Sequence, residues 1–302
     1  MMTIAITGIT GILGRFIADE LSNHEVHIRA WERLQSNRSG FKAPIEWIEG
    51  DLLNEKSMID LVDGADVVIH CALEHESNKY RDGEGDNLNL WLEKNLCGTL
   101  KLINTAYTNS VTKFLFISSR AVYGDQGSRR ILHETSRCLP DSYYGALKLA
   151  IEAFVSSYGI GKKWQIASIR PTGIYGVAYP VEHSKWYDLI KSIITHQEWN
   201  SNKGGTEVHG QDIAKIIWIL ISGQHDIAGA IYNCSDLYIT ERDVAKITRK
   251  ICGTSHPLPQ GKTIKKAIMD CSHVAQLPFK FGGIKLLNKT IEELVHYVEE
   301  NL

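Results

Sequence analysis

The start of the chain combines an apolar run, a glycine-rich turn and an amphipathic segment. Ile4–Thr7 has the character of a buried strand, and the eight residues from Thr7 to Gly14 read TGITGILG. This order predicts a strand that turns sharply into a helix, the opening unit of a dinucleotide-binding α/β fold. Apolar side chains then recur at helical spacing at Leu13, Phe16, Ile17 and Leu21.

The glycines of this turn each have a physical role. Gly8 and Gly11 permit positive φ and a close backbone approach, and Gly14 lets the helix pack tightly on the strand. A pyrophosphate can then rest on the helix N-terminus, where N–H groups are unpaired. The first gap is one residue longer than in the general Rossmann fingerprint, so on this motif alone a plain tight turn is an equal alternative.

The second apolar run, Val26–Trp31, bears on which dinucleotide is bound. An acidic residue about 20 positions after the glycines usually holds the adenosine ribose, yet this run ends without one and Glu32 comes slightly late. Arg29 and Arg33 flank that point, and a guanidinium there pairs well with a 2′-phosphate. We therefore expect NAD(P), with a lean toward NADP. The alternative is that both arginines are solvated and Glu32 takes the ribose position.

Strand-like apolar runs alternate with segments of helical spacing through the first 170 residues. This alternation predicts an α/β fold, a Rossmann-type doubly wound parallel sheet covered on both faces, with the ligand crevice at the carboxyl ends of the strands. The predicted strands are Ile4–Thr7, Val26–Ala30, Ile45–Ile48, Val67–Ala72, Phe114–Ser118 and Ile166–Arg170.

The rhythm changes after Arg170, where Gly173, Gly176 and Pro180 interrupt the pattern. A chain of 302 residues is long enough for a second lobe beside the main core. We expect a dinucleotide-binding domain over residues 1–175, with 206–236 returning to it. Residues 176–205 and 237–302 are expected to form mainly a smaller C-terminal substrate-binding lobe.

Charge and composition exclude several function classes. A formal net charge of −2 and the lack of a basic-aromatic stripe argue against nucleic-acid binding. The six cysteines are scattered without C-x-x-C pairs, so we expect reduced, mostly buried thiols and no metal site. No apolar run approaches the ~18 residues of a membrane span. We therefore expect a cytoplasmic protein with a small-molecule substrate and no membrane or nucleic-acid partner.

Tyr144 and Lys148 are four residues apart in a predicted helix over 142–157, so their side chains share a helix face. Lowering the pKa of a tyrosine from ~10 toward neutrality takes about 4 kcal/mol. An ammonium roughly 4 Å away supplies that at an effective dielectric near 20. The pair therefore suits acid–base catalysis, although a half-buried tyrosine beside a snorkelling lysine is the common structural alternative. Ser118 and Ser119 end a predicted strand, where a hydroxyl can reach the crevice.

Seven motifs in register resemble the extended short-chain dehydrogenases/reductases, the NAD-dependent epimerase/dehydratase family. The resemblance covers nearly the whole chain in the right order. The motifs are Gly8/Gly11/Gly14, Asp51-Leu52, His70-Cys71-Ala72, Asn95-x-x-Gly98-Thr99, Ser118-Ser119-x-x-Val122-Tyr123-Gly124, Tyr144-Gly145-Ala146-x-Lys148 and Arg170-Pro171-x-x-Ile174-Tyr175-Gly176.

The resemblance implies roles for individual residues. Tyr144 is the implied acid/base, Lys148 lowers its pKa and holds the nicotinamide ribose, and Ser119 orients the substrate oxygen. Asn95 is implied at the cofactor site chiefly as a support for its geometry. The implied cofactor-binding residues are Gly8, Gly11, Ile12, Leu13, Gly14, Arg29, Arg33, Asp51, Leu52, Ala72, Asn95, Tyr144, Lys148 and Pro171.

Departures from the family pattern narrow the reaction. Sugar 4,6-dehydratases carry Asp-Glu directly after the Ser119 position, where this chain has Arg120 and Ala121, so that elimination is disfavoured. Nucleotide-sugar members commonly carry asparagine at the position of Gly173 and arginine at that of Gly205. The absence of these two side chains weakens the case for a nucleotide-sugar substrate without excluding it. Lys185 or Lys203 could take their place in binding a diphosphate.

We therefore expect an NAD(P)-dependent oxidoreductase that transfers hydride at a hydroxyl or carbonyl carbon of a small or sugar-like substrate. The alternatives are a nucleotide-sugar epimerase with retained NAD and a non-catalytic NAD(P)-binding sensor. Candidate substrate contacts are Arg120, which suits an anionic group, Tyr179 and Trp186. Family members often pair the helices carrying Asn95 and Tyr144, so we expect a homodimer, with Leu102, Leu149 and Phe154 as candidate apolar surface.

Overall fold

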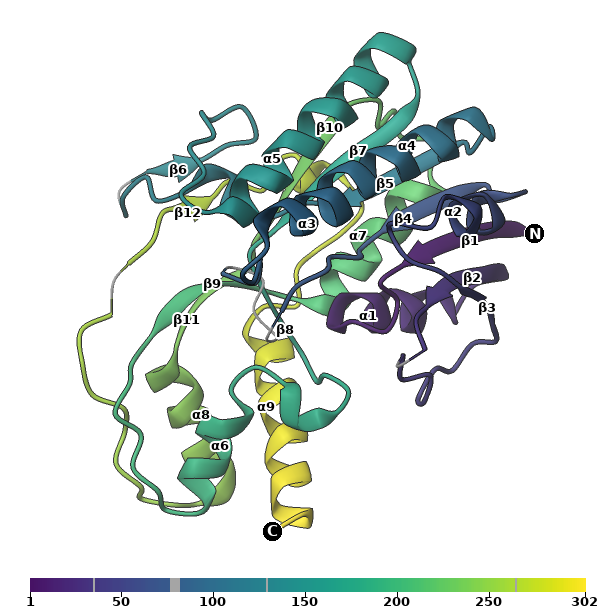
Figure 1. Ribbon diagram of the computed structural model, residues 1–302. Helices are drawn as coiled ribbons and strands as arrows, with labels where there is room; N and C mark the ends of the chain where they lie inside the picture. The colour runs from purple at the N-terminus through teal and green to yellow at the C-terminus, as the bar shows by residue number, and fades with distance from the viewer. Residues whose placement is uncertain (35, 77–81, 129, 264) are drawn as a thin grey trace.

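The computed structural model describes residues 1–34, 36–76, 82–128, 130–263 and 265–302. Its central sheet has seven parallel strands in the order β10-β7-β5-β4-β1-β2-β3 (Figure 1). The direction of the strand order reverses between β1 and β4, which opens a crevice at their carboxyl ends. The predicted doubly wound parallel sheet is therefore confirmed. The strands are β1 (Met2–Thr7), β2 (Val26–Glu32), β3 (Ile45–Glu49), β4 (Val67–His70), β5 (Lys113–Ile117), β7 (Gln165–Pro171) and β10 (Ala230–Cys234).

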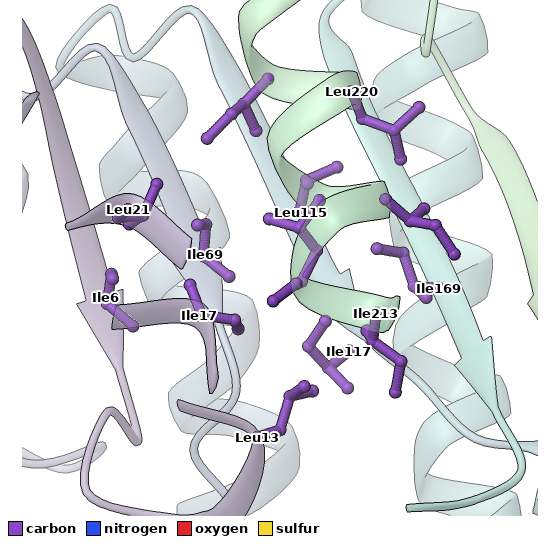
Figure 2. Packing of buried hydrophobic residues seen from close by; sticks show 14 of the residues in the cluster. Ile6, Leu13, Ile17, Leu21, Ile69, Leu115, Ile117, Ile169, Ile213 and Leu220 are labelled. Atoms are coloured by element: carbon purple, nitrogen blue, oxygen red, sulfur yellow. The ribbon is translucent and has the colours of Figure 1, made fainter. Parts of the chain in front are cut away.

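Helices cover both faces of this sheet because successive strand residues point to opposite sides. On one face, Ile6, Ile69 and Ile117 pack against α1 (Ile12–Leu21) and α7 (Gly210–Ser222), as Figure 2 shows. On the other face, alternate residues such as Val68, Phe114 and Phe116 form a second core with four other helices. These helices are α2 (Glu55–Val62), α3 (Leu88–Leu92), α4 (Gly98–Thr108) and α5 (Tyr143–Ser156). A π-helical turn, Glu93–Cys97, joins α3 to α4, and another, Ser157–Gly161, follows α5.

A separate hydrophobic cluster contains Tyr187, Ile190, Val244 and Leu294, which lie on helices below the sheet in Figure 1. It is formed by α6 (Tyr187–Ile194), α8 (Glu241–Cys252) and α9 (Gly283–Glu300). Two small sheets complete the fold: β8 (Gly173–Tyr175), β9 (Gly204–His209) and β11 (Leu237–Thr240) form one, and β6 (Ile131–Leu132) pairs with β12 (Ile268–Met269) in the other. Short 3-10 helices are Arg120–Tyr123, Val181–His183 and Val274–Gln276. The predicted residue boundaries of the two lobes stay a prediction.

The cysteines correct one expectation. All six are free, but only Cys234 is fully buried, and Cys97 is exposed. In the described part of the chain, no helix is both long and apolar enough to cross a bilayer. The same residues include no group of three or more His, Cys, Asp or Glu side chains placed to hold a metal ion.

Candidate active site

A cavity of about 1230 Å³ lies where the glycine turn after β1 meets the loops that follow β5 and β7. This volume exceeds the roughly 300–1,000 Å³ typical of a single ligand pocket. The cavity therefore has room for a dinucleotide and a second, smaller molecule. Most of the predicted site residues line it: Gly8, Gly11, Ile12, Leu13, Gly14, Arg33, Asp51, Leu52, Ala72, Ser119, Arg120, Tyr144, Lys148, Pro171 and Tyr179.

The glycine turn forms a cradle that side chains would fill. Gly8 has φ +72°, and a Cβ there would lie 2.7 Å from the backbone nitrogen of Ala72. A Cβ on Gly14 would lie 2.4 Å from the carbonyl oxygen of Gly8. The bare backbone at these positions leaves the N-terminus of α1, with Gly11 as its N-cap, open toward the cavity. These residues fit a dinucleotide pyrophosphate.

The carboxyl end of β2 contributes to the cavity wall. Glu32 is the last residue of that strand, lines the cavity and pairs with Arg38. Arg33 also lines the cavity, and its guanidinium lies 2.6 Å from the carboxylate of Glu74. The strand thus runs two residues further than predicted, because Glu32 still pairs in register with Glu49 on β3, and its end brings Glu32 to the cavity wall.

Arg29 is not among the residues that line the cavity. Its guanidinium lies 3.0 Å from the carboxylate of Glu46 on the neighbouring strand and also donates to the carbonyl oxygen of Asp63. The side chain therefore points along the sheet edge, because its hydrogen-bond acceptors lie on β3 and at the end of α2. The structure does not bring this predicted cofactor residue to the site.

Asn95 is 1% exposed and does not line the cavity either. Its amide oxygen accepts from the Glu74 backbone nitrogen at 2.7 Å, and its amide nitrogen donates to the carbonyl oxygens of Glu74 and Trp91, both at 3.0 Å. Asn95 therefore holds the loop after β4, where Ala72 and Glu74 line the cavity. Residues 77–81 of that loop lie outside the described residues.

Lys148 and Tyr144 meet at the cavity as the four-residue spacing predicts. The Lys148 ammonium is 2.7 Å from the carbonyl oxygen of Ile117, to which it donates, and 5.8 Å from the ring centre of Tyr144. The lysine is 4% exposed and packs over the ring of Phe116. Burial lowers the pKa of Lys148 to about 8, because an ammonium loses hydration there. The buried amino group of Lys148 and the ring of Tyr144 thus lie together at the cavity wall.

The two serines after β5 have different surroundings. Ser118 is buried and donates to the carboxylate of Glu152. The hydroxyl oxygen of Ser119 accepts from the Ala121 backbone nitrogen at 3.1 Å, which leaves its proton for another acceptor. Ser119 is also the less buried of the two. Its hydroxyl therefore remains able to donate to a ligand oxygen in the cavity.

A buried ion pair between Arg170 and Glu152 lies next to Ser118. Arg170 and Glu152 are 2% and 3% exposed, and the guanidinium makes two hydrogen bonds to the carboxylate, at 2.9 and 2.6 Å. Arg170 also donates to the Tyr123 hydroxyl at 2.6 Å. Glu152 lies one helical turn after Lys148 on α5, so the pair ties α5 to β7 and to Ser118.

The predicted substrate contacts are divided. Arg120 lines the cavity and donates to the carbonyl oxygen of Ala267 at 3.1 Å. Tyr179 also lines it, and its ring stacks on the guanidinium of Arg15 at 4.5 Å. Trp186 does not line the cavity, because it packs 5.4 Å from the ring of Tyr175 at the start of α6.

Glu207 is a site residue that the sequence patterns did not reveal. It is 5% exposed on β9, lines the cavity and pairs with Lys185, one of the lysines considered from sequence. The available signal was a glutamate in the short stretch GGTEVH, which begins with two glycines. Because β9 was not predicted as a strand, the face on which Glu207 lies was not evident.

Comparisons with known proteins bear on the family and the fold of this chain. The model of the NAD dependent epimerase/dehydratase family matches residues 4–235. A solved structure of UDP-glucuronic acid 4-epimerase from Bacillus cereus, in complex with NAD, superimposes with a TM-score of 0.80 at 20% identity over 99% of each chain. At this identity the likeness shows the fold alone.

Two curated relatives are more similar in sequence over shorter stretches. dTDP-D-glucose 4,6-dehydratase from Mus musculus is 30% identical over 145 residues, which cover 47% of this chain and 38% of that protein. Uronate dehydrogenase from Pseudomonas putida is 25% identical over 224 residues, covering 71% of this chain and 78% of that protein. The chain spans about two fifths of the length of several curated relatives that it matches, the mouse protein among them.

Proposed function

The chain belongs to the NAD-dependent epimerase/dehydratase family, and from this premise we propose that it is an oxidoreductase with Tyr144 as its acid/base. The observation that carries the proposal is the Lys148 ammonium, buried against the carbonyl oxygen of Ile117 and 5.8 Å from the Tyr144 ring centre. Both side chains line the cavity that the glycine cradle also lines. The substrate is a small or sugar-like molecule with a hydroxyl or carbonyl at the reacting carbon.

The roles of the side chains follow from their protonation and position. The Lys148 ammonium stabilises the phenolate form of Tyr144, which then accepts the proton of a substrate hydroxyl. Ser119 donates a hydrogen bond to the same substrate oxygen and holds it within reach of the phenol. A dinucleotide held by the cradle of Gly8, Gly11 and Gly14 would supply the hydride acceptor for the carbon that carries this oxygen, and the hydride donor in the reverse direction. The substrate becomes a carbonyl compound as its hydroxyl proton passes to Tyr144.

NAD is the proposed dinucleotide, rather than the NADP toward which the sequence pattern leans. Glu32 stands at the end of β2 and lines the cavity, where its carboxylate, which also pairs with Arg38, accepts hydrogen bonds from ribose hydroxyls. Arg29 is engaged by Glu46 and Arg33 by Glu74. Neither arginine is therefore free of a carboxylate partner that competes with a phosphate.

Arg120 is the proposed contact for an anionic group of the substrate, since it lines the cavity near the catalytic side chains. The oligomer is proposed to be a homodimer formed through α4 and α5. Phe154 is 46% exposed and Tyr107 37% exposed, so each leaves apolar surface open. Leu102, expected on that surface, instead is fully buried against the sheet.

The test compares the wild-type protein with Tyr144→Phe on a panel of free sugars, free uronates, UDP-sugars and dTDP-sugars with NAD. Loss of turnover by about 10²–10⁴-fold, with the NAD dissociation constant unchanged, is expected for removal of an acid/base hydroxyl. A sensor that binds the dinucleotide without turnover would show no difference between the two proteins. NAD that copurifies and resists dialysis would favour epimerisation over release of an oxidised product.

A further inference from the structure

Glu207 places a buried negative charge in the wall of the catalytic cavity. The residue is 5% exposed, and its carboxylate pairs with Lys185, whose side chain is 35% exposed. Burial raises the pKa of Glu207, and the ammonium groups of Lys185 and Lys266 oppose that shift. A buried ion pair contributes little net stability after its desolvation cost. A pair that also lines a cavity is therefore a candidate for ligand recognition.

Two glycines make the space for this carboxylate. Gly173 on β8 is the register partner of Glu207, and a Cβ there would lie 2.2 Å from Oε2 of Glu207 and 2.8 Å from Nζ of Lys185. Gly205 lies two residues before Glu207 and so shares its face of β9. A Cβ on Gly205 would lie 2.8 Å from Oε1 of Glu207. The carboxylate thus rests over bare backbone at two neighbouring positions, both of which line the cavity.

The pair offers a substrate an acceptor and a donor side by side. The carboxylate oxygens accept hydrogen bonds from hydroxyl groups, whereas the ammonium donates to hydroxyl oxygens. Phosphate oxygens at the same place would meet a carboxylate that cannot donate to them and whose countercharge is already supplied by Lys185. Placing phosphate charge beside a carboxylate that is 5% exposed is costly, because burial weakens the solvent screening of the repulsion.

We propose that Glu207 and Lys185 determine specificity by binding neighbouring hydroxyl groups of a free polyhydroxylated substrate and by rejecting a nucleoside diphosphate. This inference rests on the proposed oxidoreductase function and names the substrate class of that same cavity. The reacting carbon then belongs to an unactivated sugar or sugar acid rather than to a nucleotide sugar. Rejection through an unfavourable charge is a common way to gain specificity.

The deciding experiment is a calorimetric titration of UDP into protein saturated with NAD, so that UDP cannot occupy the dinucleotide site. Glu207→Gln keeps the shape of the side chain and removes its charge, and it is expected to bind UDP at least tenfold more tightly than the wild type. Glu55→Gln is the matched control, because Glu55 is 68% exposed and pairs with Lys101 on the surface. Equal UDP affinity of wild type and Glu207→Gln would overturn the inference.

Turnover gives a second, independent measurement. With a free sugar or uronate that the wild type oxidises, Glu207→Gln is expected to raise KM at least tenfold and to change kcat less. Lys185→Met alters the more exposed partner and is expected to raise KM similarly, which keeps the test available if Glu207→Gln folds poorly. A UDP-sugar with a lower KM than every free sugar would also overturn the inference. If neither class is turned over, the oxidoreductase proposal fails, while the UDP titration still decides the role of Glu207.

Discussion

Nζ of Lys148 lies 5.8 Å from the ring centre of Tyr144, one turn earlier on α5, and the same ammonium donates to the carbonyl oxygen of Ile117 at 2.7 Å. Burial lowers the pKa of Lys148 to about 8. One pKa unit corresponds to a tenfold ratio of the two forms, so the ammonium predominates at neutral pH. The lysine is thereby close to the pH at which it stops supporting the tyrosine.

Turnover is expected to fall as the pH rises through about 8, because deprotonation of Lys148 removes the cation beside Tyr144. Lys148→Met should lower kcat at neutral pH by about 10²–10⁴-fold, the typical effect of losing acid–base assistance. Lys148→Arg keeps a cation that does not titrate in this range. Its residual activity should therefore lack the alkaline decline, and profiles of kcat against pH for the three proteins provide the measurement. An unchanged decline in the arginine variant would contradict this assignment.

Gly14→Ala should weaken NAD binding and destabilise the fold, although alanine is the better helix former by about 1 kcal/mol. The added Cβ would lie 2.4 Å from the carbonyl oxygen of Gly8, so α1 has to move away from the turn. Gly161→Ala is the control, since no heavy atom lies within 4 Å of a Cβ there. Titration of NAD by intrinsic fluorescence and urea unfolding separate the two effects. Equal NAD affinity in the two variants would show that the cradle is not at Gly14.

The wild-type protein is expected to bind NAD more tightly than NADP, because Glu32 at the end of β2 offers a carboxylate to the ribose hydroxyls, whereas Arg29 and Arg33 are paired with other carboxylates. Glu32→Ala should narrow the difference between the two dissociation constants. Arg29→Ala should leave their ratio unchanged, since Arg29 is held 3.0 Å from the carboxylate of Glu46. Equilibrium titrations of both dinucleotides give these ratios. Tighter NADP binding by the wild type would restore the preference that the sequence pattern indicates.

Local sequence patterns predicted the features that depend only on the spacing of residues along the chain. The alternation of apolar runs predicted the parallel sheet, and the four-residue spacing of Tyr144 and Lys148 placed both on one face of a helix that begins at Tyr143, close to the predicted start. The position of Arg29 could not be predicted in this way. Its partner Glu46 lies on the neighbouring strand and is brought close only by sheet pairing. Glu207 could not be found for a similar reason. Glu207 reaches the cavity wall because β8 and β9 pair in register, and neither strand was predicted.

Acid should destabilise the protein through His70, which is 1% exposed between the hydroxyls of Thr7 and Thr99, at 2.6 and 2.8 Å. Burial lowers the pKa of His70 to about 3. The unfolded chain, with a histidine pKa near 6.5, binds more protons between these values, so the free energy of unfolding falls as the pH falls below about 6.5. The slope is about 1.4 kcal/mol per pH unit for this residue.

His70→Gln should flatten that slope in urea unfolding measured at several pH values. Part of the slope should remain, because burial also lowers the pKa of His209, to about 4. His183→Gln serves as the control, since His183 is exposed and its replacement should leave the slope unchanged. A wild-type slope that persists in His70→Gln would mean that His70 is protonated in the folded protein.

Arg170→Met should cost about 3–5 kcal/mol of unfolding free energy, since it leaves the carboxylate of Glu152 buried without its cation. Lys56→Met, at an exposed pair with Asp60, should change stability by less than about 0.5 kcal/mol. Combining Arg170→Met with Glu152→Leu should recover part of the loss, because the unpaired charge is then also removed. Denaturant unfolding of the single and double variants measures the coupling.

The same pair should matter for turnover, because Glu152 also accepts from Ser118, next to Ser119, and lies one turn after Lys148 on α5. The double variant restores charge balance but not the hydrogen bonds that tie α5 to β7. Its kcat should therefore stay low while its stability improves. Recovery of kcat in step with stability would show that the ion pair acts only on folding and does not position α5 for turnover.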